Sequence, residues 1–359
     1  MALTPAALRR AALTRSLPPA TSLPAAIRSL GFVQADPIRS PARAQDLILM
    51  QRVRNYRTGD LERRYPSLRV EEDMLQNYGF VPREVQALVH PRVADGRRIH
   101  AQAPGLAERV LAFVRERGHG HPREVGEHFG RTRVENAWGG GSSATTRALE
   151  ALHYGGHLRV ARRERGLRVY EPAHHLAAVH AAPLAPAQQA RGLLALVLAQ
   201  LAPLPVASLG QVVTLLGYGA PHLRDELRAG LKSLPAERAV VDGVTYLWPE
   251  GETLPDEADR RVRLLAPFDP VVWDRRRFAH LHGWTYKFEA YTPAPERQLG
   301  YYALPLFWGE RAIGWANLAV VDGSLDVDLG FVDARPKGKA FDAALEAELA
   351  RHRAFLGLE

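Results

Sequence analysis

The sequence predicts an α+β fold, with helical modules over most of the chain and an antiparallel β-rich part at its end. Three observations support it. Two stretches, 101–175 and 190–256, each place three helix-like segments before two short strand-like runs. After residue 257, strand-like runs alternate with Pro, Gly and Asp-Gly turns, and a last segment, 338–356, has the pattern of a closing helix. Three helices followed by a hairpin are typical of the winged helix, so we expect tandem winged-helix (helix-turn-helix) domains before a partial barrel.

Residues 1–100 are expected to form a mostly helical, winged-helix-like domain. Leu23–Leu30 predicts a short helix that ends at Gly31, because glycine readily takes the left-handed conformation after a helix. A further helix is expected from Ala42 to Arg54, where the apolar spacing indicates one buried face. The first residues resemble a transit peptide in having arginine and serine without acids, but the pattern continues past residue 40 and favours the first helix of this domain.

Residues 101–175 predict the second winged helix. A helix over Leu106–Arg117 is followed by one that opens at Pro122, the favoured first position for proline. The third helix is expected over Ser143–His153, with Ser142 as its N-cap. The runs "HLRVARR" and "GLRVYEP" then form a hairpin around Gly166.

Residues 176–189, rich in Ala, Pro and His, are expected to be a linker, and 190–256 the third winged helix. Its helices are predicted at 190–201, 208–216 and 221–234, and its hairpin turns at Asp242-Gly243. Residues 257–359 form the β-rich domain, with strands expected in "YKFEAYTP", "GYYALPLFWG", "RAIGWANLAVVDG" and "SLDVDLGFV".

The positive charge is concentrated at the start of the chain. The protein carries a formal net charge of +8, and residues 1–70 hold twelve arginines against four acids, so this segment accounts for the whole excess. A genome that favours arginine over lysine explains the type of base but not its local concentration. The imbalance therefore indicates a polyanionic partner such as nucleic acid.

Several classes of protein are disfavoured by what the sequence lacks. It has no cysteine, which excludes disulfides, thiolate metal sites and cysteine nucleophiles and favours a reducing, cytoplasmic location. The most apolar run, Leu193–Leu204, is interrupted by Gln200 and Pro203, so no membrane span is expected. The sequence shows no G-x-S-x-G, H-E-x-x-H, kinase or dinucleotide motif, and we expect no metal and no nucleotide cofactor.

Two short motifs are considered as a metal site and a phosphate site. "HGHP" at 119–122 offers two histidines without a third ligand at metal spacing and is interpreted as a turn before a helix. "GGGSS" at 139–143 lacks the Gly-Lys-Ser/Thr of a P-loop but leads into a helix N-terminus. Its neighbourhood either caps that helix only or also binds a DNA phosphate, and the candidate contacts are Ser142, Ser143, Thr145, Thr146 and Arg147.

The stretch "FVQADPIRSPARAQDLILMQRVRNY", residues 32–56, resembles the signature of the winged-helix DNA glycosylases of the YcaQ/AlkZ type. In that family a strand with Q-x-Q or Q-x-D precedes a helix of the "RA-x-D/H-x-x-L-x-x-R" kind. "TTRALEALHYGGHLRVARR…RVYEP", "LLAPFDPVVWDRRRF" and "YKFEAYTPAPERQLGYYALPLFWGERAIG" are similar to later family segments, and the second of these is the most recognisable. The resemblance covers most of the chain.

The resemblance implies excision of alkylated purines from double-stranded DNA, including N7-alkylguanines and, in the Q-x-D branch, interstrand crosslinks. It also implies that Gln34 and Asp36 are catalytic. The arginines that follow them would position phosphates: Arg39, Arg43, Arg52 and Arg54. We expect a monomeric DNA-repair enzyme that acts on the nucleoid in the cytoplasm.

Elementary chemistry is compatible with these two residues. An N7-alkylated guanine is cationic and leaves readily, so hydrolysis needs an anion near C1′ and a positioned water. Residues i and i+2 of an extended segment face the same side, which pairs Asp36 with Gln34, while Val33 and Ala35 pack behind. A lysine Schiff base is the other glycosylase route. The four lysines, at 232, 287, 337 and 339, are far from the motif in sequence and favour a monofunctional mechanism.

Three further interpretations stay open from the residues alone. Asp36 precedes a proline, and Asp-Pro favours turns, so it could be a turn or N-cap residue without chemistry. The whole chain could be a winged-helix transcriptional regulator, although no dimerising coiled coil is evident. Departures from the family pattern, such as "LQNYGFVP" without histidine and Gly314-Trp315-Ala316-Asn317, also leave an inactive architectural protein as a possibility.

Overall fold

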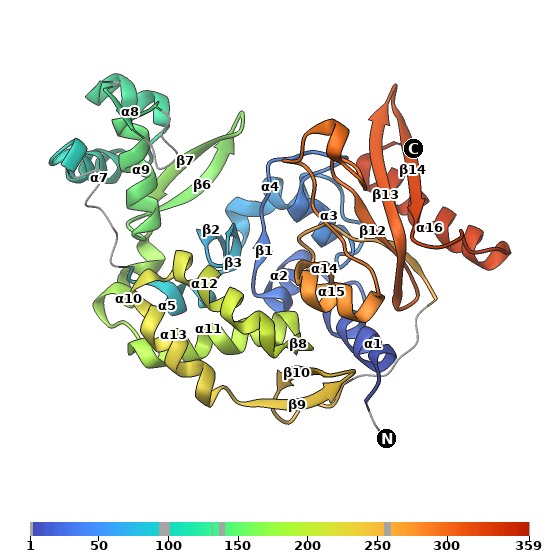
Figure 1. Ribbon diagram of the computed structural model, residues 1–359. Coiled ribbons are helices and arrows are strands. Elements are labelled where there is room, and N and C mark those ends of the chain that lie inside the picture. Colours follow the sequence, from blue (N-terminus) through green and yellow to red (C-terminus); the bar gives the residue numbers. More distant parts are fainter. Residues whose placement is uncertain (1–2, 93–100, 131, 136–140, 255–259, 359) are drawn as a thin grey trace. The chain divides into compact units, whose positions relative to one another are not determined.

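A computed structural model describes residues 3–92, 101–130, 132–135, 141–254 and 260–358 (Figure 1). The fold mixes helices and strands, as an α+β protein does. Two compact units divide the chain, and each is built from separated stretches. Unit 1 comprises 1–61, 194–212 and 231–359, and unit 2 comprises 62–193 and 213–230. The expected third module is thereby divided, because residues 213–230 belong to unit 2 and the hairpin that follows them belongs to unit 1.

Unit 1 begins with short helices and one short strand. They are α1 (Pro5–Ser16), α2 (Leu23–Leu30), β1 (Val33–Gln34) and α3 (Ala44–Met50). Helix α2 has the predicted bounds and ends at Gly31, whose φ of 66° is left-handed. A Cβ atom at Gly31 would lie only 2.4 Å from Cδ1 of Leu196, so both the conformation and the packing require glycine.

Helix α3 is shorter than the predicted span from Ala42 to Arg54. The chain leaves the helix after Met50 because its backbone pairs elsewhere: Thr21 N–H donates to Arg52 O at 2.9 Å, and Arg54 N–H donates to Thr21 O at 3.1 Å. Asn55 then takes a positive φ of 51°. No local apolar pattern indicates this pairing.

The rest of unit 1, as far as the structure describes it, contains a three-stranded sheet, a four-stranded sheet and several helices. The three-stranded sheet comprises β8 (Leu204–Pro205), β9 (Ala236–Val241) and β10 (Val244–Pro249). The predicted turn at Asp242-Gly243 is confirmed, with φ values of 48° and 79°. The four-stranded sheet comprises β11 (Val262–Leu264), β12 (Leu304–Trp308), β13 (Arg311–Val321) and β14 (Ser324–Phe331). The helices of this region are α14 (Pro270–Trp273), α15 (Arg275–His282) and α16 (Lys339–Leu356).

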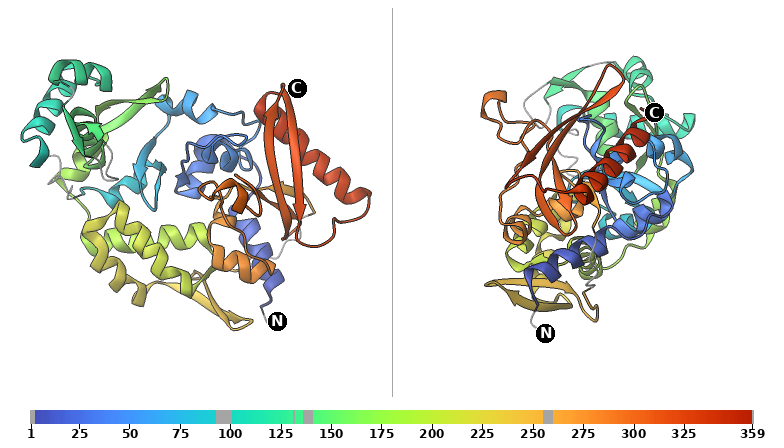
Figure 2. Two further views of the ribbon diagram at one scale, coloured as in Figure 1. Left: turned by 45° about the horizontal axis from the view of Figure 1, so that its top comes forward. Right: turned by 90° about the vertical axis from the view of Figure 1, so that its right-hand side faces the viewer.

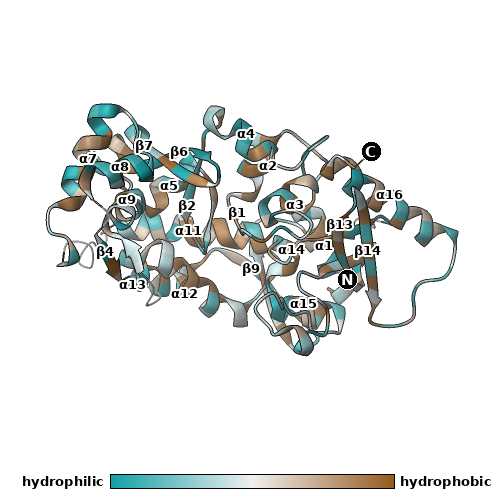
Figure 3. Ribbon diagram, turned by 90° about the horizontal axis from the view of Figure 1, so that it is seen from above, coloured by the Kyte–Doolittle hydropathy of each residue, from teal (hydrophilic) through white to brown (hydrophobic). Residues whose placement is uncertain are grey.

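Strands β11 to β14 form an antiparallel sheet in sequence order, with α16 against β11 (Figure 2). The sheet is open, so the expected partial barrel is corrected to an open four-stranded sheet. The closing helix is confirmed. Hydrophilic and hydrophobic segments alternate along α16 (Figure 3), and its apolar residues Phe341, Leu345 and Leu349 are buried.

The run "YKFEAYTP" at 286–293 does not form the predicted strand. It belongs to an irregular segment between α15 and β12. The carboxylate of Glu289 accepts the N–H groups of Gln298, Leu299 and Gly300 at 2.9, 2.8 and 3.3 Å, which closes the segment on itself. Pro293 offers no N–H to a sheet. This long-range closure overrides the local preference for strand.

Unit 2 contains the helices and hairpin predicted for 101–175 in the predicted order. They are α7 (Leu106–Arg117), α8 (Pro122–Phe129), α9 (Ala144–Tyr154), β6 (Leu158–Glu164) and β7 (Leu167–Pro172), with β4 (Arg133–Glu135) paired to β5 (Gly141–Ser143). The β6–β7 turn contains Arg165 and Gly166, both at positive φ. Ser143, rather than Ser142, is the N-cap of α9. The assignment of this module as a winged helix remains a prediction.

Unit 2 contains further elements outside this module. They are β2 (Val70–Met74), β3 (Tyr78–Pro82), α5 (Arg83–Val89), α10 (Ala177–Ala181) and α13 (Arg224–Gly230). Helices α4 (Asp60–Arg64), α11 (Pro186–Leu201) and α12 (Leu209–Gly219) cross from one unit to the other. The expected linker, 176–189, is therefore partly helical, because it holds α10 and the start of α11.

A buried ion-pair network supports β2, and the sequence patterns did not indicate it. Glu71, Glu72 and Asp73 are consecutive and all at most 3% exposed. Arg159 donates to Glu71 at 2.7 Å, and Arg92 donates to Asp73 at 2.7 Å. Arg163 pairs with Glu72. Buried carboxylates of this kind need such partners, because an unpaired buried charge is strongly destabilising.

Candidate active site

Gln34 and Asp36 lie at the end of β1, just before the chain turns toward α3. Gln34 is 6% exposed, whereas Asp36 is half-buried. Val33 is buried as expected, but Ala35 is only half-buried, so the predicted packing behind the pair holds for one residue. Asp36 is therefore partly accessible to solvent.

Asp36 is also a turn residue. Its Oδ1 accepts the N–H of Ile38 at 2.9 Å, two residues ahead, which is the geometry of an Asx turn. Its own N–H donates to Oε1 of Gln45 at 3.2 Å, and Gln45 is buried on α3. Within the described residues no donor is bonded to Oδ2 of Asp36. One carboxylate oxygen thus fixes the turn, and the other accepts no hydrogen bond from the described residues.

The surroundings of Asp36 favour its protonated form. Burial raises the pKa of this carboxyl above its ordinary value, and the Ile38 N–H opposes that rise by stabilising the anion. Sequence reasoning missed Gln45, which holds the backbone of Asp36, because its amide has no distinguishing local pattern.

Arg52 does not fit the predicted phosphate contact. Its side chain is 2% exposed and forms a bidentate ion pair with Asp269, at 2.7 and 3.0 Å. It also donates to the carbonyl oxygens of Ser16 and Ile48, both at 2.8 Å. The guanidinium therefore joins the N-terminal helices to the 264–278 motif, and the earlier expectation is corrected because burial leaves no path to DNA.

The 264–278 motif is itself a structural element. Asp269 caps α14 through the N–H of Val271, and Asp274 caps α15 through the N–H groups of Arg276 and Arg277. Arg277 is buried and donates to backbone carbonyls, including that of Val271 at 3.0 Å. The acids and at least this arginine of "FDPVVWDRRRF" therefore stabilise the segment that binds Arg52, just after α3.

Comparison with known proteins shows the family to which the chain belongs. The family model described as "DNA glycosylase AlkZ-like" matches residues 27–355. The chain belongs to this family of DNA glycosylases. A solved structure, the Streptomyces sahachiroi DNA glycosylase AlkZ, is similar with a TM-score of 0.63 and 16% sequence identity, over 99% of this chain and 98% of that one. At this identity the structural likeness concerns the fold alone.

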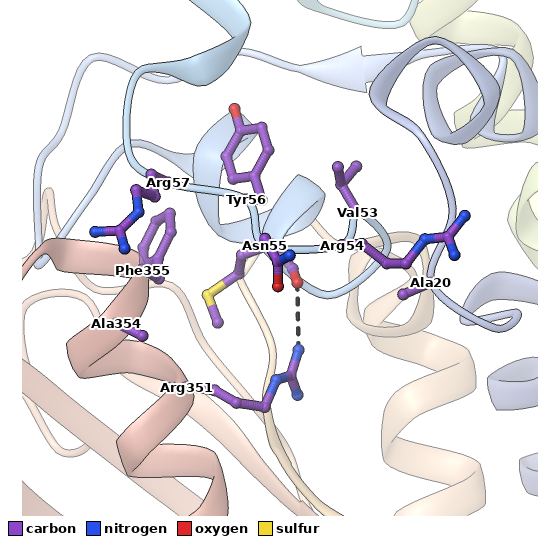
Figure 4. Close-up of a pocket in the computed structure, with 10 residues that line it drawn as sticks. Ala20, Val53, Arg54, Asn55, Tyr56, Arg57, Arg351, Ala354 and Phe355 are labelled. Atoms are coloured by element: carbon purple, nitrogen blue, oxygen red, sulfur yellow. Dashed lines mark hydrogen bonds between the residues drawn. The ribbon is translucent and has the colours of Figure 1, made fainter.

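A basic hollow in unit 1 of this AlkZ-like glycosylase lies beside the exposed Arg54 (Figure 4). It has a volume of about 340 Å³ and is bordered by the 53–57 segment and α16. Arg54, Arg57 and Arg351 contribute guanidinium groups, and none of the residues described as lining it is acidic. Arg351 is anchored through a bond to Met50 O at 3.2 Å and an ion pair with Glu348 at 2.7 Å. The hollow suits an anion.

The remaining predicted arginines differ in exposure. Arg39 is exposed on the segment between β1 and α3, where it is free to meet a phosphate. Arg43 is the N-cap residue of α3, half-buried and 3.9 Å from Asp46. Both arginines follow the turn formed by Asp36.

The polar residues near α9 belong to unit 2. Ser143 accepts the N–H of Thr146 at 3.1 Å and bonds to the hydroxyl of Thr145 at 2.9 Å. Thr145 is 1% exposed, which does not fit a phosphate contact, so that residue is corrected to a structural one. Ser142 and Thr146 are half-buried, and Arg147 pairs with Glu150 at 2.7 Å. Residues 139 and 140 of the "GGGSS" motif lie outside the described residues.

Two simpler observations complete the description. His121 caps α8 by accepting the N–H of Arg123 at 3.1 Å, so "HGHP" precedes a helix as predicted. In the described part of the chain, no group of three or more His, Cys, Asp or Glu is arranged to hold a metal ion. Nor does any helix there combine the length and apolar character of a membrane span.

Proposed function

We propose that this glycosylase hydrolyses the N-glycosidic bond of alkylated purines in duplex DNA by a monofunctional mechanism. Its substrates would be N7-alkylguanines, with interstrand crosslinks of the same chemistry included. The observation that supports this proposal is the state of Asp36: half-buried, fixed by its turn, and with one carboxylate oxygen unbonded by the described residues.

The proposed reaction follows from the charge of the substrate. As the C1′–N9 bond breaks, its electron pair moves to the cationic base, which leaves neutral and needs no general acid. The sugar gains oxocarbenium character, which the Asp36 carboxylate stabilises. A water then attacks C1′ and loses its proton to Asp36, while the Gln34 amide orients that water.

The lysines of the chain support a monofunctional mechanism over a Schiff base. The sequence has lysine only at positions 232, 287, 337 and 339, and none lies in the 31–56 segment that carries the motif. An amine nucleophile would have to approach C1′ beside Asp36. Water is therefore the proposed nucleophile.

The arginines of unit 1 are proposed to hold the DNA backbone. Arg39 is exposed close to Asp36 in the chain, and Arg54 borders the basic hollow. Guanidinium groups bind phosphate oxygens through charge-assisted hydrogen bonds and release counterions, which makes binding dependent on salt. These contacts would give register and affinity without reading the base.

The test uses duplex oligonucleotides that contain one N7-methylguanine or one nitrogen-mustard crosslink. Asp36→Asn should lower the single-turnover rate of base release by about 10²- to 10⁴-fold, because the base catalyst is lost. Asparagine can still accept the Ile38 N–H, so the turn should persist. Asp60→Asn is a matched control, since Asp60 also accepts a backbone N–H in its turn, at 2.8 Å from Arg57 N.

Free base can be measured by chromatography and abasic sites by strand cleavage in alkali. We expect wild type and Asp60→Asn to release the base at similar rates. If wild type binds the duplexes but releases no base from either, the proposal fails and the non-catalytic alternative gains support.

A further inference from the structure

Tyr291 places its ring in solvent. It lies in the 286–301 loop, the irregular segment between α15 and β12 that is orange in Figure 1. The side chain is 82% exposed, more than any other large hydrophobic residue in the described part of the chain. A single exposed aromatic side chain is common on protein surfaces and needs no function. Tyr291 differs because its loop is closed by internal hydrogen bonds and also carries an arginine and a second exposed tyrosine.

Hydrogen bonds fix the backbone that carries Tyr291. The N–H of Thr292 donates to Glu289 O at 3.0 Å, which makes 289–292 a turn with Tyr291 at its third position. Glu289 is 4% exposed, and its carboxylate accepts the N–H groups of residues 298–300 at the other end of the loop. The two ends are thereby joined. A loop that is already ordered loses little conformational entropy when it binds a ligand.

The ring of Tyr291 is supported by one aromatic neighbour. Its centroid lies 6.0 Å from that of Phe288 in an edge-to-face arrangement. Phe288 is half-buried and contacts Phe268 and Tyr302 in the same manner, with centroids 5.0 and 5.3 Å away. The exposed ring therefore rests on a packed aromatic cluster. Because most of its surface remains in solvent, a planar group has room to stack on it.

A cation lies beside this tyrosine on the same loop. Nε of Arg297 donates at 2.8 Å to the carbonyl oxygen of Thr292, the residue after Tyr291. The guanidinium carbon of Arg297 also lies 5.0 Å from the ring centroid of Tyr301, which is 42% exposed. Its terminal nitrogens donate to no acceptor among the described residues. Proteins that bind unpaired nucleic acid combine such groups, with aromatic rings stacking on bases and guanidinium groups binding phosphates.

We propose that the 286–301 loop is a binding site for an unpaired nucleobase of the DNA, with Tyr291 stacking on the base and Arg297 binding the adjoining phosphate. The family of the chain supplies DNA as the partner, and any base can stack because each has a π-face. A base inside the duplex has both faces covered, so the site takes a base that has left the stack. The inference goes beyond the proposed function, because it requires no particular lesion and no chemistry at Asp36.

The experiment measures binding of undamaged DNA to the full chain by fluorescence anisotropy. The probes are a fully paired duplex and the same duplex with one extra, unpaired thymine. Tyr291→Ala should bind the bulged duplex about 5- to 100-fold more weakly than wild type, as expected for the loss of one stacking contact. It should bind the paired duplex as wild type does. Tyr291→Phe should match wild type on both probes, because phenylalanine keeps the ring and loses only the hydroxyl.

Tyr218→Ala is the matched control, since Tyr218 on α12 is 56% exposed. It should leave both affinities unchanged. A fluorescent adenine analogue at the unpaired position supplies a second readout, because stacking quenches its emission. At saturating protein, the emission should be higher with Tyr291→Ala than with wild type. All variants should keep the melting temperature of wild type, because each change is made at an exposed side chain.

Equal affinities of wild type and Tyr291→Ala for the bulged duplex would overturn the inference. So would an equal loss on both probes, which indicates a contact with paired DNA, or a similar loss in Tyr218→Ala, which indicates a general effect of removing an exposed tyrosine. A changed oligomeric state of Tyr291→Ala with unchanged DNA binding would also overturn it and assign the ring to a contact between copies of the chain. None of these outcomes bears on Asp36, whose role is decided by base release.

Discussion

Asp36 is compatible with both interpretations made from the sequence, that of a turn residue and that of a catalytic residue. It forms the turn that Asp-Pro favours, through the Ile38 N–H, and it presents a second oxygen to a half-buried site. The turn is what gives the carboxylate a fixed position, and a fixed base loses little free energy to reorganisation during reaction. A local structural role thus supports the proposed chemistry.

Two arginines separated by one residue are expected to behave in opposite ways. Arg52→Ala leaves Asp269 buried without its partner, which should reduce the free energy of unfolding by about 3–5 kcal/mol. Arg54→Ala removes an exposed side chain and should change that free energy by less than about 0.5 kcal/mol. Urea unfolding followed by circular dichroism measures both. Comparable stabilities for the two variants would contradict the structural role of Arg52.

At the scale of elements, the 53–57 segment and α16 together form the basic hollow. If DNA phosphate occupies it, Arg54→Ala should weaken binding to any duplex and reduce the slope of log affinity against log salt by about 1. Fluorescence anisotropy over a salt series measures this. Arg335→Ala is a matched control, because Arg335 is exposed in the same unit and pairs with Asp342 at 2.7 Å. An unchanged slope for Arg54→Ala argues against phosphate in the hollow.

Elements whose ends are marked by a glycine, a proline or an Asp-Gly turn could be predicted from the sequence. Helix α2 ends at Gly31, α8 opens at Pro122, and the β9–β10 turn lies at Asp242-Gly243, because each boundary depends on the conformation of one or two residues. The predictions failed where distant partners decide. Examples are the short α3, whose following residues pair with Thr21, and the 286–293 run, which Glu289 closes into a loop.

The candidate site was likewise predictable only where its residues lie in a local motif. Gln34 and Asp36 could be found because they lie together in a recognisable motif. The burial of Arg52 could not, since its partner Asp269 is 217 residues away in the chain.

At the scale of the whole molecule, both units hold buried or half-buried histidines whose pKa values are lowered. In unit 1, burial and then the nearby Arg9 and Arg277 lower the pKa of His282 to about 3. In unit 2, burial, followed by Arg83 and Arg159, lowers the pKa of His175 to about 4. The pKa values of His90 and His153 are also lowered, chiefly by burial.

These shifts predict a loss of stability in mild acid. The unfolded chain takes up protons on its histidines near pH 6.5, whereas folded His175 does so only near 4, so the unfolded state binds more protons between these values. Stability should therefore be fully present above about pH 6.5 and fall steadily toward pH 4. Below that, Asp73 adds to the loss. Burial acts to raise its pKa, but Arg92 and His90 hold the pKa well below its ordinary value.

Melting temperatures at several pH values between 7.5 and 4 measure this dependence. His175→Gln is the informative variant, since glutamine keeps a polar group near Gln86, which bonds to His175 at 2.6 Å, but cannot titrate. Its melting temperature should depend less steeply on pH across this window than that of wild type. Equal slopes for the two proteins would show that His175 does not remain neutral in the folded state, and a stability that rises on acidification would contradict the whole set of buried neutral histidines.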